Sequence, residues 1–500
     1  LMKNTLLLLF TLICATLGHA QESIQWMTIE EAYALTTTEE SPKKIFIDVY
    51  TDWCGWCKRM DKATFQKPEV AMYMNENFYN VKFNAEQKED IEILENTFKF
   101  VAQGSRGYHE LAAALLNGKM SYPTVLFMNG NKKLELHFDD LDSEFHTYSY
   151  KIVHCNANWE PSSLNPQEYI SGYFNGFIED YKYSFNTLFS YIHYKLEFPN
   201  QELTFTKSGN YIIKVYANNN EDDLLLTRRF FVVEQRVSIE SNIHMATLAR
   251  HRDYKQEVDF TINTQNYNIQ DPYADIQVVL SQNRRWDNAI FNLKPLFVRT
   301  PELIYNYEDN NLFDGNNEFR FFDAKDLRYQ SMNVDGVQIE NGKTHLWVLA
   351  EEPRSFKRYY TQQDINGKRL IKRDQSNEQN READYMLTHF TLKRETPVEN
   401  ADIYVFGELS DWQFKEDFKM EYVEVEKEYR LTTLLKQGYY NYMYATLASG
   451  EKEGDLSVIE GTHSETENDY YFFVYHRQRG EIYDRLVGFH QDNSVKELDD

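Results

Sequence analysis

The chain has 500 residues, too many for a single hydrophobic core, and this length predicts about two to four domains. It contains 36 Tyr and 33 Phe but only 20 Gly and 11 Pro, which favours folded, β-rich structure over disorder. The formal net charge of −25 repels nucleic acid and anionic lipid headgroups, so neither is expected as a partner.

The N-terminal residues have the pattern of a secretory signal peptide. Lys3 precedes a short apolar run that begins at Leu6, and the small residues Gly18 and Ala20 precede the predicted cleavage point. A membrane anchor is the alternative, but the run is shorter than the roughly 20 residues that a spanning helix needs. A lipoprotein site at Cys14 is disfavoured because Ile13 stands where a small residue is expected. We therefore expect export and cleavage after Ala20, with no membrane-spanning segment.

Export would leave three cysteines, Cys54, Cys57 and Cys155. Three thiols cannot build a disulfide scaffold, and no second close pair completes a four-cysteine zinc site. Neither a metal nor a cofactor is expected from the sequence.

Residues 21–131 alternate helix and strand signals, which predicts an α/β fold. Thr28 and Glu31 form a capping-box pattern before an amphipathic stretch. The apolar run 45–50 is typical of a central parallel strand. The remaining expected elements are helices at 54–65, 68–78 and 109–116 (Gly118 as C-cap), strands at 81–83 and 124–128, and a turn at Asn129-Gly130.

The sequence Trp53-Cys54-Gly55-Trp56-Cys57 follows directly on the buried strand and opens a helix. Cys54 would lie at the helix N-terminus, where free N–H groups and the macrodipole stabilise a thiolate. Cys57 lies about one turn later, so its sulfur can resolve a mixed disulfide.

Two further residues complete this candidate site. Asp48 places a carboxylate in the middle of the apolar strand, where burial would raise its pKa and suit it to exchange protons with Cys57. Pro123 follows Tyr122 just before the last strand, and a cis peptide bond there would bring its loop against the sulfurs.

Together these features resemble the thioredoxin-like family over about residues 25–131. The resemblance implies thiol–disulfide exchange, with Cys54 as the attacking sulfur, Cys57 as the resolving sulfur, Asp48 as the buried acid and Pro123 as the cis-proline. Trp56 departs from the family, in which many members carry proline, and this leaves the direction of the redox reaction open.

Each site residue also has a structural interpretation. The cysteine pair could be an inert disulfide, Asp48 could face solvent if its strand were at a sheet edge, and Pro123 could be an ordinary trans proline. Moreover, a thioredoxin fold needs another strand and a closing helix after residue 128. The segment 134–138 could supply the strand, but it equally resembles the first strand of the following domain, and no helix follows. The module is therefore expected to be incomplete, with an uncovered sheet edge.

From about residue 134 the chain consists of short strand-like runs separated by Asn, Asp and Gly clusters. A hairpin is predicted from 211–216 and 224–233.

No catalytic triad, zinc-ligand spacing or phosphate loop stands out in this part of the sequence. Cys155, next to His154, is interpreted as a buried structural thiol. The polar stretch 375–382 is expected to form a mobile hairpin tip. Further strands are expected at 148–153, 276–280, 345–349, 385–392, 403–406 and 439–445.

Several longer strings resemble the plug protein family of the type 9 secretion system, over about residues 133–490. They include residues 136–141, 150–159, 183–187, 208–211 and 315–323. The resemblance implies a periplasmic β-domain protein that docks on the outer-membrane translocon barrel and closes it between export events.

The last domain, with residues 405–412 and 436–442, resembles the early-set immunoglobulin-like fold of glycogen-binding modules. Glycan binding through an exposed Trp412 is one interpretation, and a core position for this aromatic residue is the other.

The expected fold is therefore a thioredoxin-like α/β module followed by immunoglobulin-like β-sandwich domains. The expected function is a noncatalytic plug or gating component of the translocon, fused to a thiol–disulfide module that acts on client proteins. A periplasmic thiol–disulfide oxidoreductase is the alternative. The expected domains are a signal peptide (1–20), the thioredoxin-like domain (21–131), β domains at 132–235, 236–395 and 396–490, and a tail (491–500).

Overall fold

The computed structural model describes residues 23–38, 43–93, 96–103, 106–116, 120–128, 133–142, 144–200, 202–265 and 267–495. It divides into two compact units, residues 1–133 and residues 134–500. Each unit has hydrophobic clusters of its own, around Ile47 in the first and around residues such as Ile213, Val278 and Tyr442 in the second.

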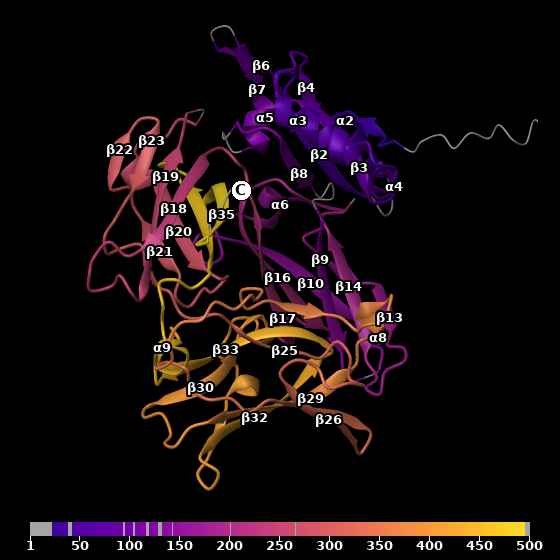
Figure 1. The fold of residues 1–500 in the computed structure, drawn as a ribbon, viewed down its shortest axis with the longest axis vertical. Coiled ribbons are helices and arrows are strands. Elements are labelled where there is room, and N and C mark those ends of the chain that lie inside the picture. Colours follow the sequence, from indigo (N-terminus) through magenta and orange to yellow (C-terminus); the bar gives the residue numbers. More distant parts are fainter. Residues whose placement is uncertain are drawn as a thin grey trace, which may run out of the picture. The chain divides into compact units, whose positions relative to one another are not determined.

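The first unit mixes helices and strands, as predicted. Its elements are β1 (Trp26–Met27), α2 (Ile29–Thr38), β2 (Lys44–Tyr50), α3 (Gly55–Met60), the π-helix η2 (Asp61–Phe65), α4 (Pro68–Asn77), β3 (Phe78–Asn84), β4 (Ile91–Ile93), β5 (Asn96–Phe98), β6 (Phe100–Gln103), β7 (Arg106–His109), α5 (Glu110–Leu115) and β8 (Thr124–Met128) (Figure 1). The capping box before α2 is confirmed: Thr28 N–H donates to Glu31 Oε2 at 2.9 Å and Glu31 N–H to Thr28 Oγ1 at 3.1 Å.

The sheet of the first unit has the strand order β1-β3-β2-β8. β2 runs parallel to β3 and antiparallel to β8, so it is an interior strand, and five consecutive residues from Ile45 to Val49 are buried. The apolar run 45–50 predicted this position because a strand covered on both faces needs no polar alternation.

Two hairpins in the first unit were not predicted. β4 pairs with β5, and β6 pairs with β7, between the third sheet strand and α5. These strands are three or four residues long, too short to give a clear alternation in the sequence. The expected C-cap at Gly118 and the turn at Asn129-Gly130 lie outside the described residues.

Residues 134–138 could have formed the last strand of the thioredoxin-like domain or the first strand of the next domain. In the structure they belong to the second unit. β9 (Leu134–Asp140) pairs along its length with β14 (Ile192–Phe198), with Leu136 opposite Leu196. β8 is therefore an edge strand of the first sheet, and Val125 and Phe127 are 40% and 61% exposed. The expected open edge is what the described residues form.

The first β module, residues 134–232, packs two sheets around one core. One sheet has the order β12-β10-β16-β17 and the other β13-β14-β9, while β11 and β15 form a small pair beside them. The expected hairpin at 211–233 is β16 and β17. The remaining elements are β10 (Tyr148–Cys155), α6 (Pro166–Tyr169), β11 (Ile170–Gly172), β12 (Asn175–Ile178), β13 (Asp180–Tyr183), β15 (Leu203–Phe205), β16 (Gly209–Ala217) and β17 (Leu224–Val232).

The second β module combines residues 238–314 with residues 469–493. In Figure 1 the yellow strand β35 lies among the pink strands β18 and β20, and β34 pairs with β20 over seven positions. The elements are β18 (Ser238–Met245), β19 (Lys255–Asn263), α7 (Pro272–Asp275), β20 (Ile276–Gln282), β21 (Ile290–Leu293), β22 (Phe297–Arg299), β23 (Glu302–Tyr305), β24 (Leu312–Asp314), β34 (Asp469–His476) and β35 (Arg485–Asn493).

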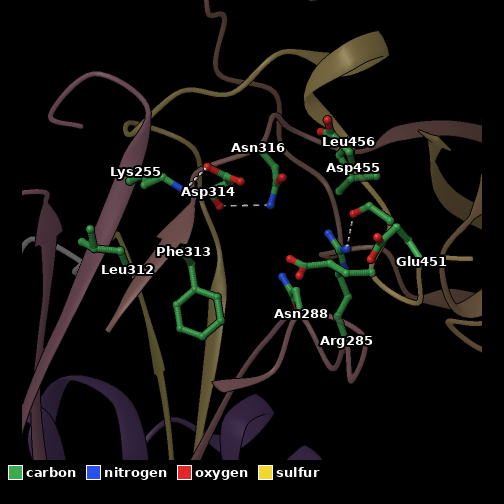
Figure 2. A pocket seen from close by; sticks show the side chains of 12 residues that line it. Lys255, Arg285, Asn288, Leu312, Phe313, Asp314, Asn316, Glu451, Asp455 and Leu456 are labelled. Atoms are coloured by element: carbon green, nitrogen blue, oxygen red, sulfur yellow. Dashed lines mark hydrogen bonds and ion pairs between the residues drawn. The ribbon is translucent and has the colours of Figure 1, made fainter. Parts of the chain in front are cut away.

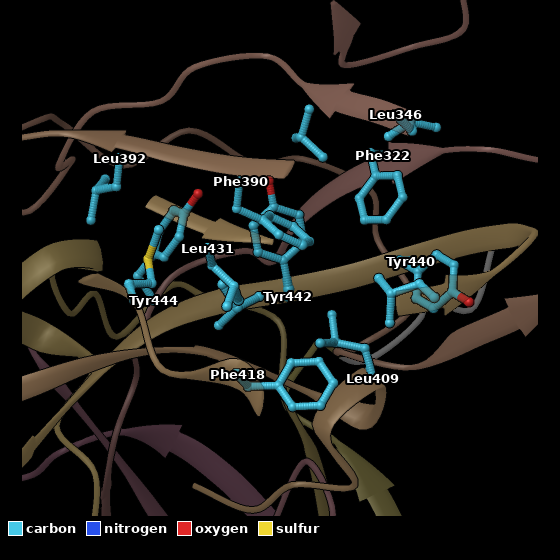
Figure 3. Packing of buried hydrophobic residues seen from close by; sticks show 14 of the residues in the cluster. Phe322, Leu346, Phe390, Leu392, Leu409, Phe418, Leu431, Tyr440, Tyr442 and Tyr444 are labelled. Carbon is cyan, nitrogen blue, oxygen red and sulfur yellow. The ribbon is translucent and has the colours of Figure 1, made fainter. Parts of the chain in front are cut away.

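The third β module, residues 320–460, is built around β33 and a core rich in aromatic residues. Phe322, Phe390, Tyr440 and Tyr442 pack together there (Figure 3). The elements are β25 (Arg320–Asp323), β26 (Val334–Glu340), β27 (Lys343–Val348), β28 (Arg369–Ile371), α8 (Gln379–Glu382), β29 (Tyr385–Lys393), β30 (Ala401–Phe406), the 3-10 turns η3 (Glu408–Ser410) and η4 (Glu416–Phe418), β31 (Glu421–Val423), β32 (Glu428–Lys436), β33 (Gly438–Ala448) and α9 (Ser457–Glu460).

Strand pairing does not follow the break near residue 396 that chain order suggested. β29 ends at Lys393 and pairs with β32, and β25 pairs with β33, so strands on both sides of that position share sheets. The third β module is inserted into the second, which the last two strands complete. The order of predicted strands along the chain does not show such an insertion. The strand pairs that define it join residues about 200 positions apart, such as Ile276 and His476.

The polar stretch 375–382 is not a free hairpin tip. Its second half forms α8, and Arg381 Nε donates to the carbonyl of Tyr183 at 2.9 Å while Phe185 N–H donates back to the carbonyl of Arg381. The stretch therefore connects the third β module to the first. Within the described residues, none of the helices has the length and apolarity needed to cross a bilayer.

Candidate functional site

Cys54 and Cys57 are joined in a disulfide at the start of α3. Cys54 is the N-cap residue, and its sulfur accepts a hydrogen bond from the N–H of Cys57 at 3.0 Å. Both cysteines are more than nine-tenths buried, whereas the flanking Trp53 and Trp56 are 55% and 67% exposed. A sulfur at this position meets N–H groups that have no helical partner, and such groups favour the thiolate form.

Asp48 is buried in the interior strand that leads to the cysteines. It lies between Lys82 of β3 and Val125 of β8, and only 2% of it is exposed. Its Oδ1 has no hydrogen-bond partner among the described residues, and its Oδ2 is 3.9 Å from Lys82 Nζ. Lys82 forms its closer ion pair with Asp61. Burial raises the pKa of Asp48 to about 6, and the partial attraction of Lys82 offsets only some of this effect.

The loop before β8 contains a cis peptide bond between Tyr122 and Pro123. The next residue, Thr124, pairs with Val49 of β2. The Tyr122 ring packs edge-on against Trp53, with 6.0 Å between ring centroids, so this loop lies beside the residue that precedes Cys54. The structure thus brings the proline loop to the disulfide from a position about 70 residues away in the chain.

The aromatic rim carries charged groups that the sequence did not identify. The Arg106 guanidinium lies 5.3 Å from the Trp53 ring centroid, and the Trp53 indole N–H donates to Glu86 Oε1 at 3.0 Å. Arg59 lies 5.2 Å from the Trp56 ring centroid. Arg106 belongs to an unpredicted hairpin, so only the three-dimensional structure could place it here. The arrangement can hold a peptide beside the disulfide, because exposed aromatic rings supply apolar contact area.

The second unit contains a polar pocket of about 330 Å³ between its second and third β modules (Figure 2). Lys255 Nζ is 2.7 Å from Asp314 Oδ1, and Arg285 is paired with Asp287 and donates to the carbonyl of Gly454. Burial raises the pKa of Glu453. The residues that line the pocket include no Ser, Thr, Cys or His. Both cations that line the pocket are therefore already paired with carboxylates.

Trp412 is partly buried and packs against the aromatic cluster that contains Phe319 and Phe406. Its ring packs edge-on against Phe319 and Phe406, with centroids 6.0 and 5.6 Å away, and its indole N–H is buried without a partner among the described residues. Asp411 and Trp412 both adopt positive φ. These contacts favour the structural interpretation of Trp412 over the glycan-binding one, which stays a prediction. Cys155 is a buried free cysteine, and the pKa of its thiol is raised by burial to about 11.

Comparisons with known proteins also assign the two parts of the chain to different families. A family described as "Type 9 secretion system plug protein 1st domain" matches residues 112–234. A thioredoxin-like family described as "Protein of unknown function, DUF255" matches residues 14–141. The two matches overlap between residues 112 and 141, the region where the sheet of the first unit ends and β9 begins.

A solved structure from Parabacteroides merdae, titled as a hypothetical protein, is 34% identical, with a TM-score of 0.71 and coverage of 73% of this chain and 92% of that one. Curated relatives are "Uncharacterized protein B0495.5" of Caenorhabditis elegans, 29% identical over 22% of this chain, and "Spermatogenesis-associated protein 20" of Rattus norvegicus, 30% identical over 18%. The chain spans only 17% and 12% of the length of these two relatives.

The fold and the site define a thioredoxin-like domain joined to a β-rich unit that begins with a type 9 secretion system plug domain. The chain belongs to the same family as the Parabacteroides merdae protein.

Proposed function

We propose that the chain is a periplasmic, noncatalytic plug of the type 9 secretion translocon, fused to a thiol–disulfide exchange module. The match of residues 112–234 to the first domain of plug proteins carries this proposal. The partner would be the outer-membrane translocon barrel, which the second unit would block between export events. We interpret the paired sheets of its β modules as immunoglobulin-like sandwiches.

The contacts among the three β modules support a role as a shaped obstacle. Tyr475 O–H donates to Asn210 Oδ1 at 2.7 Å between the second and first β modules, and Ala157 N–H donates to Asp484 Oδ2 at 2.9 Å. Arg285 donates to the carbonyl of Gly454 at 2.9 Å between the second and third. Buried polar contacts that are fully paired favour one arrangement of the modules, which an obstacle in a pore requires.

Purification of the translocon tests the plug role. A tagged copy of the full chain is expressed in its own cell envelope and captured after gentle detergent extraction. The translocon barrel should be recovered with it, and a Cys54→Ser/Cys57→Ser variant should recover the same amount. Repeated failure to recover the barrel under conditions that keep the barrel intact would defeat the proposal.

The disulfide and its surroundings support a second function, thiol–disulfide exchange on client proteins. In the oxidised state a client thiolate attacks Cys54 Sγ, the Cys54–Cys57 bond breaks, and the electron pair leaves on Cys57 Sγ. Asp48, on the strand that leads to the pair, would protonate that thiolate, and its raised pKa suits it to this transfer. A second client thiolate then attacks the client sulfur of the mixed disulfide and releases Cys54 as a thiolate, so the client leaves oxidised. The reverse sequence reduces a client disulfide.

The remaining site residues have supporting roles in this proposal. The loop with the cis bond at Pro123 would offer backbone groups to an extended client, next to Trp53. Turnover of a disulfide substrate by the full chain, lost in Cys54→Ser and retained in Cys155→Ser, would support the exchange function. Absence of turnover by a folded wild-type chain would remove it and leave the plug role untouched.

The proposed location is the periplasm. The signal-peptide pattern at residues 1–20, which lie outside the described part of the chain, supports export. The net charge of −25 opposes nucleic-acid binding.

A further inference from the structure

A histidine and two carboxylates converge on one face of neighbouring strands in the second β module. His244 of β18 lies directly opposite Glu257 of β19 in the antiparallel register, and Asp259 is two residues further along β19. Side chains at positions two apart share a face, so all three point the same way. One potential ligand atom from each residue lies within 4.8 Å of the others.

The tautomer of His244 is fixed by its backbone partner. Its Nδ1 is 2.8 Å from the carbonyl oxygen of Met245, and since a carbonyl can only accept, Nδ1 carries the hydrogen. In the neutral ring Nε2 then presents a lone pair, and this lone pair faces Asp259 Oδ2 at 3.2 Å. Two acceptors in contact need a cation or an added proton between them.

Both carboxylates also accept hydrogen bonds from neighbouring donors. Asn306 Nδ2 donates to Asp259 Oδ2 at 2.9 Å, Asn311 Nδ2 donates to Asp259 Oδ1 at 3.0 Å, and Thr247 N–H donates to Glu257 Oε2 at 2.7 Å. Metal-binding histidines and carboxylates are usually oriented by outer hydrogen bonds of this kind.

The free-energy cost of burying these carboxylates is high unless a cation balances their charge. Glu257 is 2% exposed and Asp259 is 9% exposed, and among the described residues neither forms an ion pair with Lys or Arg. Asn311 is fully buried, and its Oδ1, on the amide that binds Asp259, has no hydrogen-bond partner in the described structure. Two carboxylates that face one imidazole can place more negative than positive charge at a position that is mostly buried, which is costly without a cation.

We propose that His244, Glu257 and Asp259 bind a zinc ion, through the Nε2 of His244 and one oxygen of each carboxylate. The nitrogen ligand argues against Ca²⁺ and Mg²⁺, which take oxygen ligands, and imidazole with carboxylate is a donor set that suits Zn²⁺. Three protein ligands leave a fourth tetrahedral position open. The His244 side chain is 33% exposed, so this site is accessible from solvent.

Zinc at this site would link β18 and β19 to the loop that contains Asn306 and Asn311. That loop connects β23 and β24, which both pair with β19. The site would stabilise the second β module independently of the disulfide in the first unit. The sequence did not reveal it because the register of two strands, and not a short spacing, brings His244 to Glu257.

The test is calorimetric titration of ZnCl₂ into the full chain, without a histidine tag and after treatment with a chelator. Cys54→Ser/Cys57→Ser is introduced throughout so that free thiols cannot bind the metal. The expected result is one zinc per chain. His244→Gln should weaken binding by about tenfold or more, whereas His251→Gln, on the same module but outside the cluster, should leave it unchanged.

The buried carboxylates are poor sites for substitution because their variants risk misfolding. A second readout therefore uses the unsubstituted cluster: zinc should raise the melting temperature and Ca²⁺ at the same concentration should not. Absence of zinc binding, equal affinity in His244→Gln, or stabilisation by Ca²⁺ alone would each overturn the proposal. The first of these results would assign the Nε2–Oδ2 contact to a shared proton.

Discussion

Asp139 of the first β module accepts a hydrogen bond from Lys436 of the third at 2.5 Å, although 297 positions separate them. The two side chains are 6% and 9% exposed. Asp139 also accepts from His193 at 2.6 Å and from Tyr385 at 2.7 Å. Burial raises the pKa of Asp139, but these hydrogen bonds and the Lys436 charge more than compensate and lower it below the usual range. The pair connects the first strand of the second unit, β9, to β32 of the third β module.

Lys436→Met should strongly destabilise the second unit, because it leaves the Asp139 charge buried without its cation. The expected loss is about 3–5 kcal/mol, measured as a lower urea midpoint. Lys427→Met is the control, because Lys427 pairs with Glu395 where both side chains are more than half exposed. It should cost no more than about 1 kcal/mol. Equal midpoints for the two variants would contradict the account of this interface.

The pKa of Asp48 predicts how the stability of the first unit depends on pH. Its folded pKa of about 6 lies above the ordinary 3.8, so the folded state binds this proton more tightly than the unfolded state does. The resulting stabilisation is fully present below pH 3.8 and is lost as the pH rises through 6, by at most about 3 kcal/mol. Asp48→Asn should remove this dependence and be more stable than wild type at pH 8.

Hydrogen exchange of peptides that cover β2, corrected for the intrinsic exchange rate, measures this effect locally at pH 5 and pH 8. The control is Asp61→Asn. Burial raises the pKa of the Asp61 carboxyl, but hydrogen bonds from Lys82 and Gln66 outweigh this effect and lower the pKa. This control should not stabilise the unit at pH 8. The interpretation of Asp48 as a buried acid would fail if wild type and Asp48→Asn showed the same change in protection between the two pH values.

The open edge at β8 predicts self-association of the chain at high concentration. An unpaired strand edge with exposed apolar side chains is a template for pairing with another strand. Phe127→Lys should lower the association measured by sedimentation equilibrium. Tyr73→Lys is matched in exposure, 60% against 61%, but lies on α4 and should have no such effect. If both variants remain as associated as wild type, β8 is not the contact.

The packing of the partly buried Trp412 ring predicts a structural effect of its substitution. Trp412→Ala removes a ring that packs on Phe319 and Phe406, and it should lower the free energy of unfolding by about 3 kcal/mol. Retention on immobilised polysaccharide should be equally low for wild type and variant. A folded variant of unchanged stability that had lost retention would restore the glycan-binding interpretation.

The sequence could place Asp48 on the buried strand and the cysteines at the helix start because this information is local, while the catalytic roles of these residues stay predictions. Asp48, Cys54 and Cys57 lie within ten positions, and hydrophobic continuity with helix-start chemistry is enough to place them. Pro123 was identified with the family resemblance, and the structure shows its cis bond. What the sequence could not predict depends on how strands pair: Arg106 on an unexpected short hairpin, His244 opposite Glu257, and β34 beside the distant β20.

The strand Leu134–Asp140 illustrates the same limit most clearly. Its alternation fits the last strand of the first unit and the first strand of the second equally well, and both families match it. Long-range contacts decide the matter: Leu136 pairs with Leu196 and is buried in the core of the first β module. A period-two pattern defines which face of a strand is apolar, but it does not define the partner.

The current through the purified translocon barrel, measured in a planar bilayer, tests the proposed gating role most directly. Addition of the full chain to the periplasmic side should lower the current to that of a closed channel, and Cys54→Ser/Cys57→Ser should do so equally well. An unchanged current, while the chain is shown to be bound to the barrel, would contradict the account.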